Sequence, residues 1–366
     1  MTTNSKELTL FLGAGDEMRC GVGHFTLLLQ AAVERLEPGS NTSLTLTRGQ
    51  GFLIEVWRAV GSANSVVCNF PIVAWKRVIF RPLLSLAMAR VRGKRVVLIQ
   101  HEWASLNWMR RLTYIPAALL ANTIVMFSPL VRQELADDTL IGWTARKAIL
   151  APLPPNVEAP AITTTSNLAQ RLQTARANEG RLVVGHFGSI YPAKQPNALL
   201  DIAVILKAKG FKPLLVYIGS FIRGTDNVEA DFFARVDALG LKDDVIVSGY
   251  IASESEVFGV FKEVDVFCYP LTEGLTARRS SILACAQAGK PLIVTGPARA
   301  DEFDHHPRFK RLIERGDIVF VPRSCANDTY AERIVAASKR SIAAEPFDFD
   351  GWWHHVAGAI VAQFNR

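Results

Sequence analysis

One stretch of this sequence, near position 275, combines the side chains that bind anions. It follows a short apolar run that ends at Tyr269, and it contains an acid, a glycine, two arginines and two serines: Glu273, Gly274, Arg278, Arg279, Ser280 and Ser281. Guanidinium groups, hydroxyls and the amides at the start of a helix together suit a ligand with several negative charges, such as a diphosphate. The alternative interpretation is that the arginines are surface residues paired with local acids.

A second loop has a related composition. Gly188 and Ser189 follow an apolar run, and Lys194 stands just before a helix-like segment that starts near residue 197. A lysine and free amides at this position can surround a phosphate. Lys194 is therefore the favoured phosphate ligand, and the alternative is a solvated lysine in the first turn of a helix.

Two further places invite a functional interpretation in the first half of the chain. His101 and Glu102 directly follow the apolar run 95–100, and an imidazole at the end of a strand can position a hydroxyl or transfer a proton. The alternative is a histidine that only hydrogen-bonds a neighbouring loop. Glycines between residues 13 and 23, including Gly21 and Gly23, allow a backbone to approach a ligand or simply to turn, and both interpretations stay open.

Several motifs are missing, which excludes other chemistry. The chain has neither the Walker pattern GxxxxGK[ST] nor GxSxG or HExxH. The histidine pairs 305–306 and 354–355 have no second ligand pair at a suitable spacing, so we expect no metal site and no cofactor. The five cysteines are widely separated, which fits a reducing cytoplasm and no disulfide framework.

The length and charge of the chain bound its organisation. Its 366 residues suggest two domains, and a formal net charge of +7 favours an anionic partner. No known nucleic-acid-binding module is present, so we expect no nucleic acid. Basic and aromatic residues accumulate between Trp75 and Tyr114, which suits either two ordinary helices with solvated arginines or a peripheral contact with an anionic membrane at the inner face of the plasma membrane.

Short apolar runs alternate with helix-length amphipathic segments, the pattern of βα units around parallel sheets. The first half contains candidate strands at 8–12, 44–47, 65–69, 95–100, 123–127 and 147–151, and the second half at 181–187, 213–218, 244–248, 265–269, 291–295 and 318–321. This predicts an α/β chain with two Rossmann-like domains. We place the N-terminal domain at 1–152, a linker at 153–168, the C-terminal domain at 169–348, and a final helix that packs back across the domains at 349–366.

With these motifs in view, the sequence resembles the family-4 glycosyltransferases of the GT-B fold. The resemblance rests on Phe187 to Lys194, on Gly249 and Tyr250, on the 265–270 strand, and on the block from Glu273 to Pro291. Such enzymes have two facing Rossmann-like domains and transfer a sugar from a nucleotide diphosphosugar, generally with retention and without an essential metal.

The resemblance also implies a role for particular residues. It makes His101 and Glu273 the catalytic pair, with Glu273 at the sugar. It places the donor diphosphate against Gly188, Ser189, Lys194, Gly274, Leu275, Thr276, Arg278, Arg279 and Ser280, the nucleoside against Tyr250 and Ser281, and the loop of Gly21 and Gly23 toward donor or acceptor.

This chain departs from the family pattern at two positions. Ser189 stands where the family usually has an arginine, so Arg278 or Arg279 would have to supply the missing charge. The family's second glutamate falls near Ser281 or Ala284, which leaves the nucleotide open. We expect transfer of a hexose-type sugar to a glycan or lipid-linked acceptor in cell-envelope polysaccharide assembly. The alternatives are a nucleotide-sugar epimerase or hydrolase, and a catalytically silent binding module.

Overall fold

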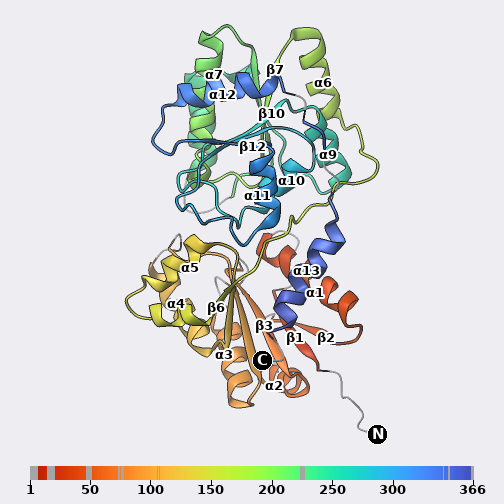
Figure 1. The fold of residues 1–366 in the computed structure, drawn as a ribbon, viewed down its shortest axis with the longest axis vertical. Coiled ribbons are helices and arrows are strands. Elements are labelled where there is room, and N and C mark those ends of the chain that lie inside the picture. Colours follow the sequence, from red (N-terminus) through yellow and green to blue (C-terminus); the bar gives the residue numbers. More distant parts are fainter. Residues whose placement is uncertain are drawn as a thin grey trace. The chain divides into compact units, whose positions relative to one another are not determined.

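The computed structural model of the chain describes residues 7–14, 21–46, 52–72, 75, 78–104, 106, 108–222, 227–340, 342–344 and 347–363. It contains two compact units, and the second is inserted into the first. The first unit comprises Met1–Asn156 and Asp348–Arg366, and the second comprises Val157–Phe347. Each unit is a parallel sheet with helices on both faces (Figure 1).

The first unit contains six strands: β1 (Thr9–Gly13), β2 (Asn41–Thr45), β3 (Ser65–Phe70), β4 (Arg95–Gln100), β5 (Thr123–Met126) and β6 (Ala148–Leu150). Its helices are α1 (Gly21–Leu36), α2 (Phe52–Ser62), α3 (Phe80–Val91), α4 (Trp108–Leu120), α5 (Pro129–Ala136), the 3-10 helix η3 (Gly142–Lys147) and α13 (Phe349–Val361). The strands are all parallel and lie in the order β2-β1-β3-β4-β5-β6.

The second unit repeats this plan with β7 (Leu182–Phe187), β8 (Pro213–Ile218), β9 (Val245–Val247), β10 (Val266–Tyr269), β11 (Leu292–Thr295) and β12 (Ile318–Val321). Its helices are α6 (Asn167–Glu179), η4 (Pro192–Lys194), α7 (Pro196–Ala208), α8 (Val228–Ala238), η5 (Lys242–Asp244), α9 (Glu254–Lys262), α10 (Ser280–Ala286), α11 (Pro307–Glu314) and α12 (Asn327–Ser338). The strand order is β12-β11-β10-β7-β8-β9, that of dinucleotide-binding Rossmann folds.

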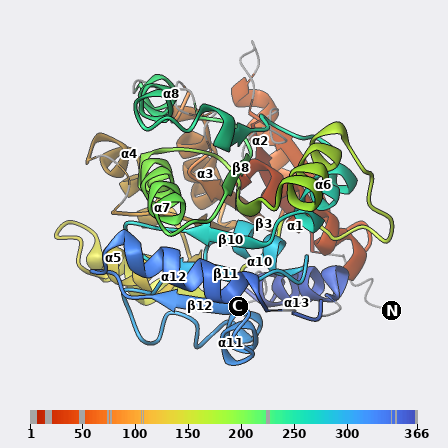
Figure 2. The same ribbon diagram turned by 90° about the horizontal axis from the view of Figure 1, so that it is seen from above.

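The central strands are apolar along their whole length because both faces of each sheet are covered. In β8, Leu214 and Val216 belong to one apolar layer, whereas Leu215 and Tyr217 belong to the layer on the other face. Helices α7 and α12 cover one face and α6 covers the other (Figures 1 and 2). A strand that is buried on both sides cannot alternate apolar with polar residues, which explains the continuous runs in the sequence.

The prediction of two Rossmann-like α/β domains is confirmed, and all twelve predicted strands are present within a few residues of the expected bounds. The C-terminal helix belongs to the first unit, where it packs on α1. The indole of Trp353 is buried, lies 5.2 Å from the ring of Phe25, and donates a hydrogen bond of 3.2 Å to the carbonyl of Pro155. The end of the chain is therefore part of the core that supports α1.

Candidate functional site

The two sequence motifs of the second unit meet at the carboxyl ends of two neighbouring strands in the middle of its sheet. Strands β7 and β10 are neighbours, and the chain leaves them toward opposite sides, to β8 and to β11. Such a switch point leaves a crevice beyond the carboxyl ends of the two strands, where α/β proteins bind ligands. The loop after β7 and the loop after β10 touch here, since Gln195 Nε2 donates a hydrogen bond of 2.9 Å to Thr272 Oγ1.

The loop after β7 is shaped to return Lys194 to the strand end. Gly188 has a φ of +107° and Gln195 a φ of +47°, and the short helix η4 lies between them. A methyl group on Gly188 would lie 2.8 Å from Nζ of Lys194 and 3.6 Å from Cβ of Ser281. A side chain at position 188 would therefore displace the ammonium, so glycine is required both for the backbone conformation and for this close approach.

Lys194 is a buried cation, with 6% of its surface exposed. Among the described residues no carboxylate forms an ion pair with it, and its ammonium lies 5.5 Å from the ring centre of Tyr191. Burial, and then repulsion by Arg279, lower the pKa of Lys194 to about 7. A buried cation without an acidic partner is costly in the free protein and attracts an anion.

Glu273 is held by both arginines of the second motif. Arg278 Nη2 donates hydrogen bonds of 2.9 and 3.0 Å to the two carboxylate oxygens, and Arg279 Nη2 donates to Oε1. Burial alone would raise the pKa of Glu273, but the two guanidinium groups outweigh it and hold the pKa below its usual range. Glu273 is thus a carboxylate at neutral pH, and it is oriented by its own loop.

The two arginines are buried rather than on the surface, since their side chains are only 10% and 9% exposed. Arg279 also donates a hydrogen bond of 2.6 Å from Nη1 to the hydroxyl of Tyr191. Arg278 and Arg279 both contact the carboxylate of Glu273, and Lys194 lies close enough to Arg279 for their charges to repel each other. When Lys194 is protonated, the cluster therefore holds a cation that no carboxylate of the described residues pairs, beside the guanidinium of Arg279, which suits an anionic ligand such as a diphosphate.

The turn after β10 depends on Gly274, whose φ is +79°. A methyl group there would lie 2.1 Å from the carbonyl oxygen of Gly296. The amide of Gly274 donates to the carbonyl of Leu271 at 3.2 Å, and the amide of Leu275 donates to that of Thr295 at 2.9 Å. Both amides, predicted as phosphate donors, are thus engaged within the protein in this conformation.

The remaining predicted residues of the second unit differ in exposure. Thr276 is buried, and its hydroxyl has no hydrogen-bond partner among the described residues. Ser280 and Ser281 are half-buried in the first turn of α10, and Ser189 is exposed at the end of β7. Tyr250 follows β9 and is 67% exposed. Ser281 is therefore the hydroxyl that the structure brings beside Gly188 and Lys194.

His101 lies at the carboxyl end of β4 in the first unit, as expected. Its ring packs between Phe25 and Phe127, with ring centres 5.2 and 5.0 Å away, and Nε2 lies 3.3 Å from Oδ1 of Asn69. Asn69 Nδ2 in turn donates a hydrogen bond of 2.9 Å to Thr26 Oγ1. The imidazole is half-buried and oriented by a second layer of polar groups, an arrangement that suits proton transfer or the binding of a hydroxyl.

The glycines of the first turn are only partly described. Residues 15–20 lie outside the described residues, whereas Gly21 begins α1 and Gly23 is buried within it. A methyl group on Gly21 would meet no atom within 4 Å, so packing does not require glycine at this position. His306 is buried and caps α11, where Nδ1 accepts a hydrogen bond of 3.3 Å from the amide of Phe309.

Solved structures of glycosyltransferases share this fold. HepE from Anabaena, in complex with UDP-glucose, superposes with a TM-score of 0.60 at 14% identity, over 97% of this chain and 95% of that chain. A glycosyltransferase from Rickettsia africae ESF-5 gives 0.57 at 13% identity over 98% and 93% of the two chains. Sucrose-phosphate synthase from Thermosynechococcus elongatus gives 0.55 at 13% identity over 98% and 94%. No protein-family model and no curated protein sequence matches this chain.

The chain has the GT-B fold. In the carboxyl-terminal unit of this fold, sequence reasoning missed Tyr191 and His186. Tyr191 holds Arg279, and its place three residues before Lys194 in the same loop was the only available signal. His186 is buried under the site against Tyr269, with ring centres 4.5 Å apart, and burial, followed by repulsion from Lys194, lowers its pKa to about 3. A neutral His186 adds no charge to the cluster at neutral pH.

Two observations concern metals and membranes. Among the described residues no group of three or more histidine, cysteine, aspartate or glutamate side chains is arranged to hold a metal ion. In the same part of the chain, every helix is too short or too polar to cross a bilayer.

Proposed function

We propose that this protein is a glycosyltransferase that takes a hexose-type sugar from a nucleotide diphosphosugar, and that it belongs to the family-4 enzymes. The observation that carries this proposal is Lys194, a buried ammonium without an acidic partner among the described residues, beside Gly188 and Ser281 at the switch point of the sheet. Few structural roles explain a buried, uncompensated cation, whereas a diphosphate would neutralise it.

The donor diphosphate in this proposal lies against Lys194, Ser281 and the guanidinium of Arg279. Tyr191 and Glu273 keep Arg279 in place, so the guanidinium supplies the charge that Ser189 lacks. Structures of HepE contain UDP and UDP-glucose, which makes UDP-sugars the first donors to test.

The proposed reaction proceeds with retention and needs no divalent metal. Negative charge develops on the leaving diphosphate, and fixed cations already stand where that charge develops, which lowers the barrier without reorganisation. Glu273 acts at the sugar, and His101 acts as the histidine of related enzymes does, on a sugar hydroxyl or on a transferred proton. The acceptor is a glycan or a lipid-linked sugar of cell-envelope polysaccharide assembly.

The test is an incubation of the purified protein with radiolabelled UDP-, GDP-, ADP- and TDP-sugars, with and without candidate acceptors. We expect one donor to label an acceptor, with retention of the anomeric configuration by NMR, at the same rate in excess chelator. Free sugar or an epimer without any labelled acceptor would reject glycosyl transfer in favour of a hydrolase or epimerase. Loss of transfer on chelation, with recovery on adding magnesium or manganese, would reject the metal-independent mechanism.

A further inference from the structure

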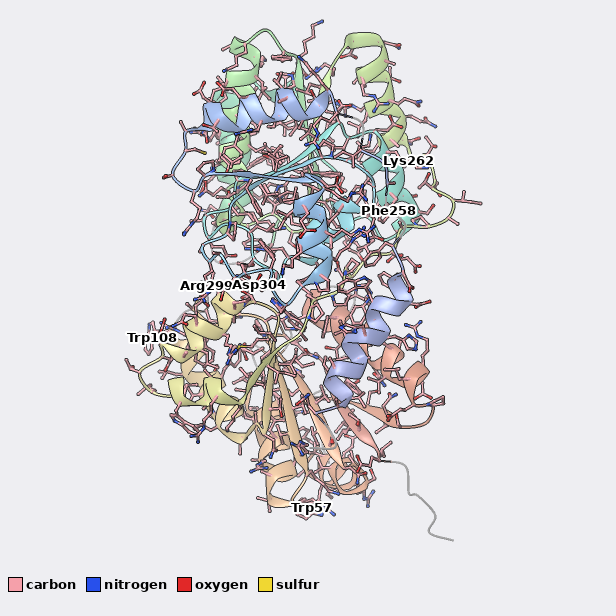
Figure 3. The ribbon with its side chains drawn as sticks, in the orientation of Figure 1. Trp57, Trp108, Phe258, Lys262, Arg299 and Asp304 are labelled. Atoms are coloured by element: carbon pink, nitrogen blue, oxygen red, sulfur yellow. The ribbon has the colours of Figure 1, made fainter. Side chains whose placement is uncertain are left out.

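Helix α4 presents an apolar stripe on the side that faces away from its own unit. Residues 108, 112 and 119 are spaced so that they lie on one face of a helix, and Ile115 lies at the border between this face and the core. Trp108 is 63% exposed, and the stripe with its flank includes further exposed apolar residues, namely Met109, Leu112 and Leu119. Figure 3 shows Trp108 at the margin of the first unit.

The other side of α4 accounts for its packing on the sheet. Tyr114, Ala117 and Ala118 are the buried residues of the helix, and they lie opposite the stripe. A helix on the surface of a soluble domain normally has polar residues on the face opposite its buried one, and contiguous exposed apolar residues mark an interaction site. Ile115 packs partly against the core of the first unit, whereas the exposed side chains of Trp108, Leu112 and Leu119 are not explained by that packing.

The helix η3 extends this surface with another aromatic residue and with cations. Lys147 Nζ donates hydrogen bonds of 3.1 and 2.9 Å to the carbonyls of Leu119 and Ala121, which fixes η3 against the end of α4. Trp143 is half exposed, and the guanidinium of Arg146 lies 5.0 Å from its ring centre. We call Trp108, Met109, Leu112, Leu119 and Trp143, with Arg111, Arg146 and Lys147, the α4 face.

The helices of this face, α4 and η3, contain basic residues and no acid, and the nearest acids lie in the neighbouring α5 and directly after it, at Glu134, Asp137 and Asp138. From Arg58 to Arg132 the sequence contains eleven lysines and arginines and a single acid, Glu102. Helix α3 likewise contains arginines and no acid. Helix η3 contains one arginine and one lysine. The net charge of this segment, eleven positive minus one negative, is larger than the +7 of the whole chain. The positive charge of the chain is therefore concentrated in this segment.

We propose that the α4 face binds the surface of an anionic lipid bilayer, with α4 lying in the plane of the interface. Apolar and indole side chains would enter the boundary between headgroups and acyl chains, and the arginines would contact lipid phosphates, whereas the ammonium of Lys147 is bonded to carbonyls at the end of α4. A second copy of this chain suits the face less well, because a twofold contact would bring the arginines of α4 and η3 close to their own copies.

The experiment is co-sedimentation of the whole chain with vesicles of phosphatidylcholine alone, or of phosphatidylcholine mixed with phosphatidylglycerol. We expect binding to the mixed vesicles that weakens as salt is added. The variant Trp108→Ser/Leu112→Ser should bind at least about tenfold more weakly, because it removes apolar area from the interface. The variant Arg111→Gln/Arg146→Gln should bind about thirtyfold more weakly, at about 1 kcal/mol for each of the two charges.

The matched control is Leu53→Ser/Ile54→Ser, which removes two exposed apolar residues from α2 of the same unit. This control should bind mixed vesicles as tightly as the original chain does. All variants should have the melting temperature of the original chain. Equal binding to neutral and anionic vesicles, or equal loss in the α2 control, would overturn the proposal. Sedimentation that shows a dimer lost in Trp108→Ser/Leu112→Ser, without vesicle binding, would assign the face to self-association. None of these measurements uses a nucleotide sugar. Their outcome is therefore independent of the proposed reaction.

Discussion

Replacing Lys194 with methionine should strengthen the free protein and weaken its binding of a nucleoside diphosphate. Methionine keeps the length of the side chain and removes its charge. Burial and Arg279 lower the pKa of Lys194 from 10.5 to about 7, so the charged form is disfavoured in the folded state. At 1.36 kcal/mol for each pKa unit, this difference corresponds to about 4 kcal/mol at neutral pH.

The sign of this effect follows from proton binding. Between pH 7 and 10.5 the unfolded chain holds a proton on Lys194 that the folded chain releases, so the cost of the charge is greatest below pH 7 and disappears as the pH rises toward 10.5. We therefore expect Lys194→Met to be more stable at pH 7 by about 2–4 kcal/mol, with a melting temperature higher by at least about 4 °C, and to lose this advantage near pH 10.

The binding of a nucleoside diphosphate should change in the opposite direction. Loss of a charged hydrogen bond costs about 1.5–3 kcal/mol, which is roughly a tenfold to 150-fold loss of affinity. Differential scanning calorimetry measures the stability and isothermal titration calorimetry the affinity, with Lys339→Met as the control because Lys339 is exposed at the end of α12. A variant that is less stable than the original chain and binds nucleotide as well as it does would refute this reasoning.

Three further predictions concern the same site. Arg279→Ala should weaken nucleoside-diphosphate binding by about 1.5–3 kcal/mol, and by more than Arg278→Ala does, because Arg279 lies beside Lys194. If calorimetry finds less than about a threefold loss of affinity in both variants, the diphosphate site is misplaced. Since the bound anion favours the protonated form of Lys194, the affinity for a nucleoside diphosphate should fall as the pH rises above 7, and binding should take up as much as one proton. Equal binding heats in buffers of different ionisation enthalpy would contradict this uptake. Gly274→Ala should destabilise the protein by more than about 1 kcal/mol through its contact with Gly296, whereas Gly21→Ala, measured as control by thermal unfolding, should not.

The strands could be predicted because each is a local apolar run bounded by turn residues. Arg95 to Gln100 reads as a buried strand in any context, and β4 has these bounds in the structure. The order of strands in the first sheet has no such local signal, since it depends on which side of β1 each crossover connection takes. The packing of Trp353 on Phe25 joins residues from the two ends of the chain, and spacing along the sequence carries no information about it.

The position of Lys194 could be predicted because the residues that place it are neighbours in sequence. Gly188 and Gln195 turn the loop, and both are close to the lysine along the chain. The pairing of Glu273 with the two arginines agrees with one part of the alternative interpretation, arginines paired with local acids, but the burial of these arginines does not, since it depends on the geometry of the turn at Gly274. Sequence reasoning assigned the arginines to the ligand, whereas in the structure they also orient the carboxylate.

The most direct test of the donor site is a crystal structure of the chain with its nucleoside diphosphate. A panel of UDP, GDP, ADP and TDP in thermal unfolding identifies that nucleotide, because a ligand that binds only the folded state raises the melting temperature. We predict that the diphosphate lies within hydrogen-bond distance of Lys194 Nζ and Ser281 Oγ, with Arg279 beside it. A nucleotide bound elsewhere, with Lys194 still buried and without a phosphate partner, would contradict the site and the function proposed from it.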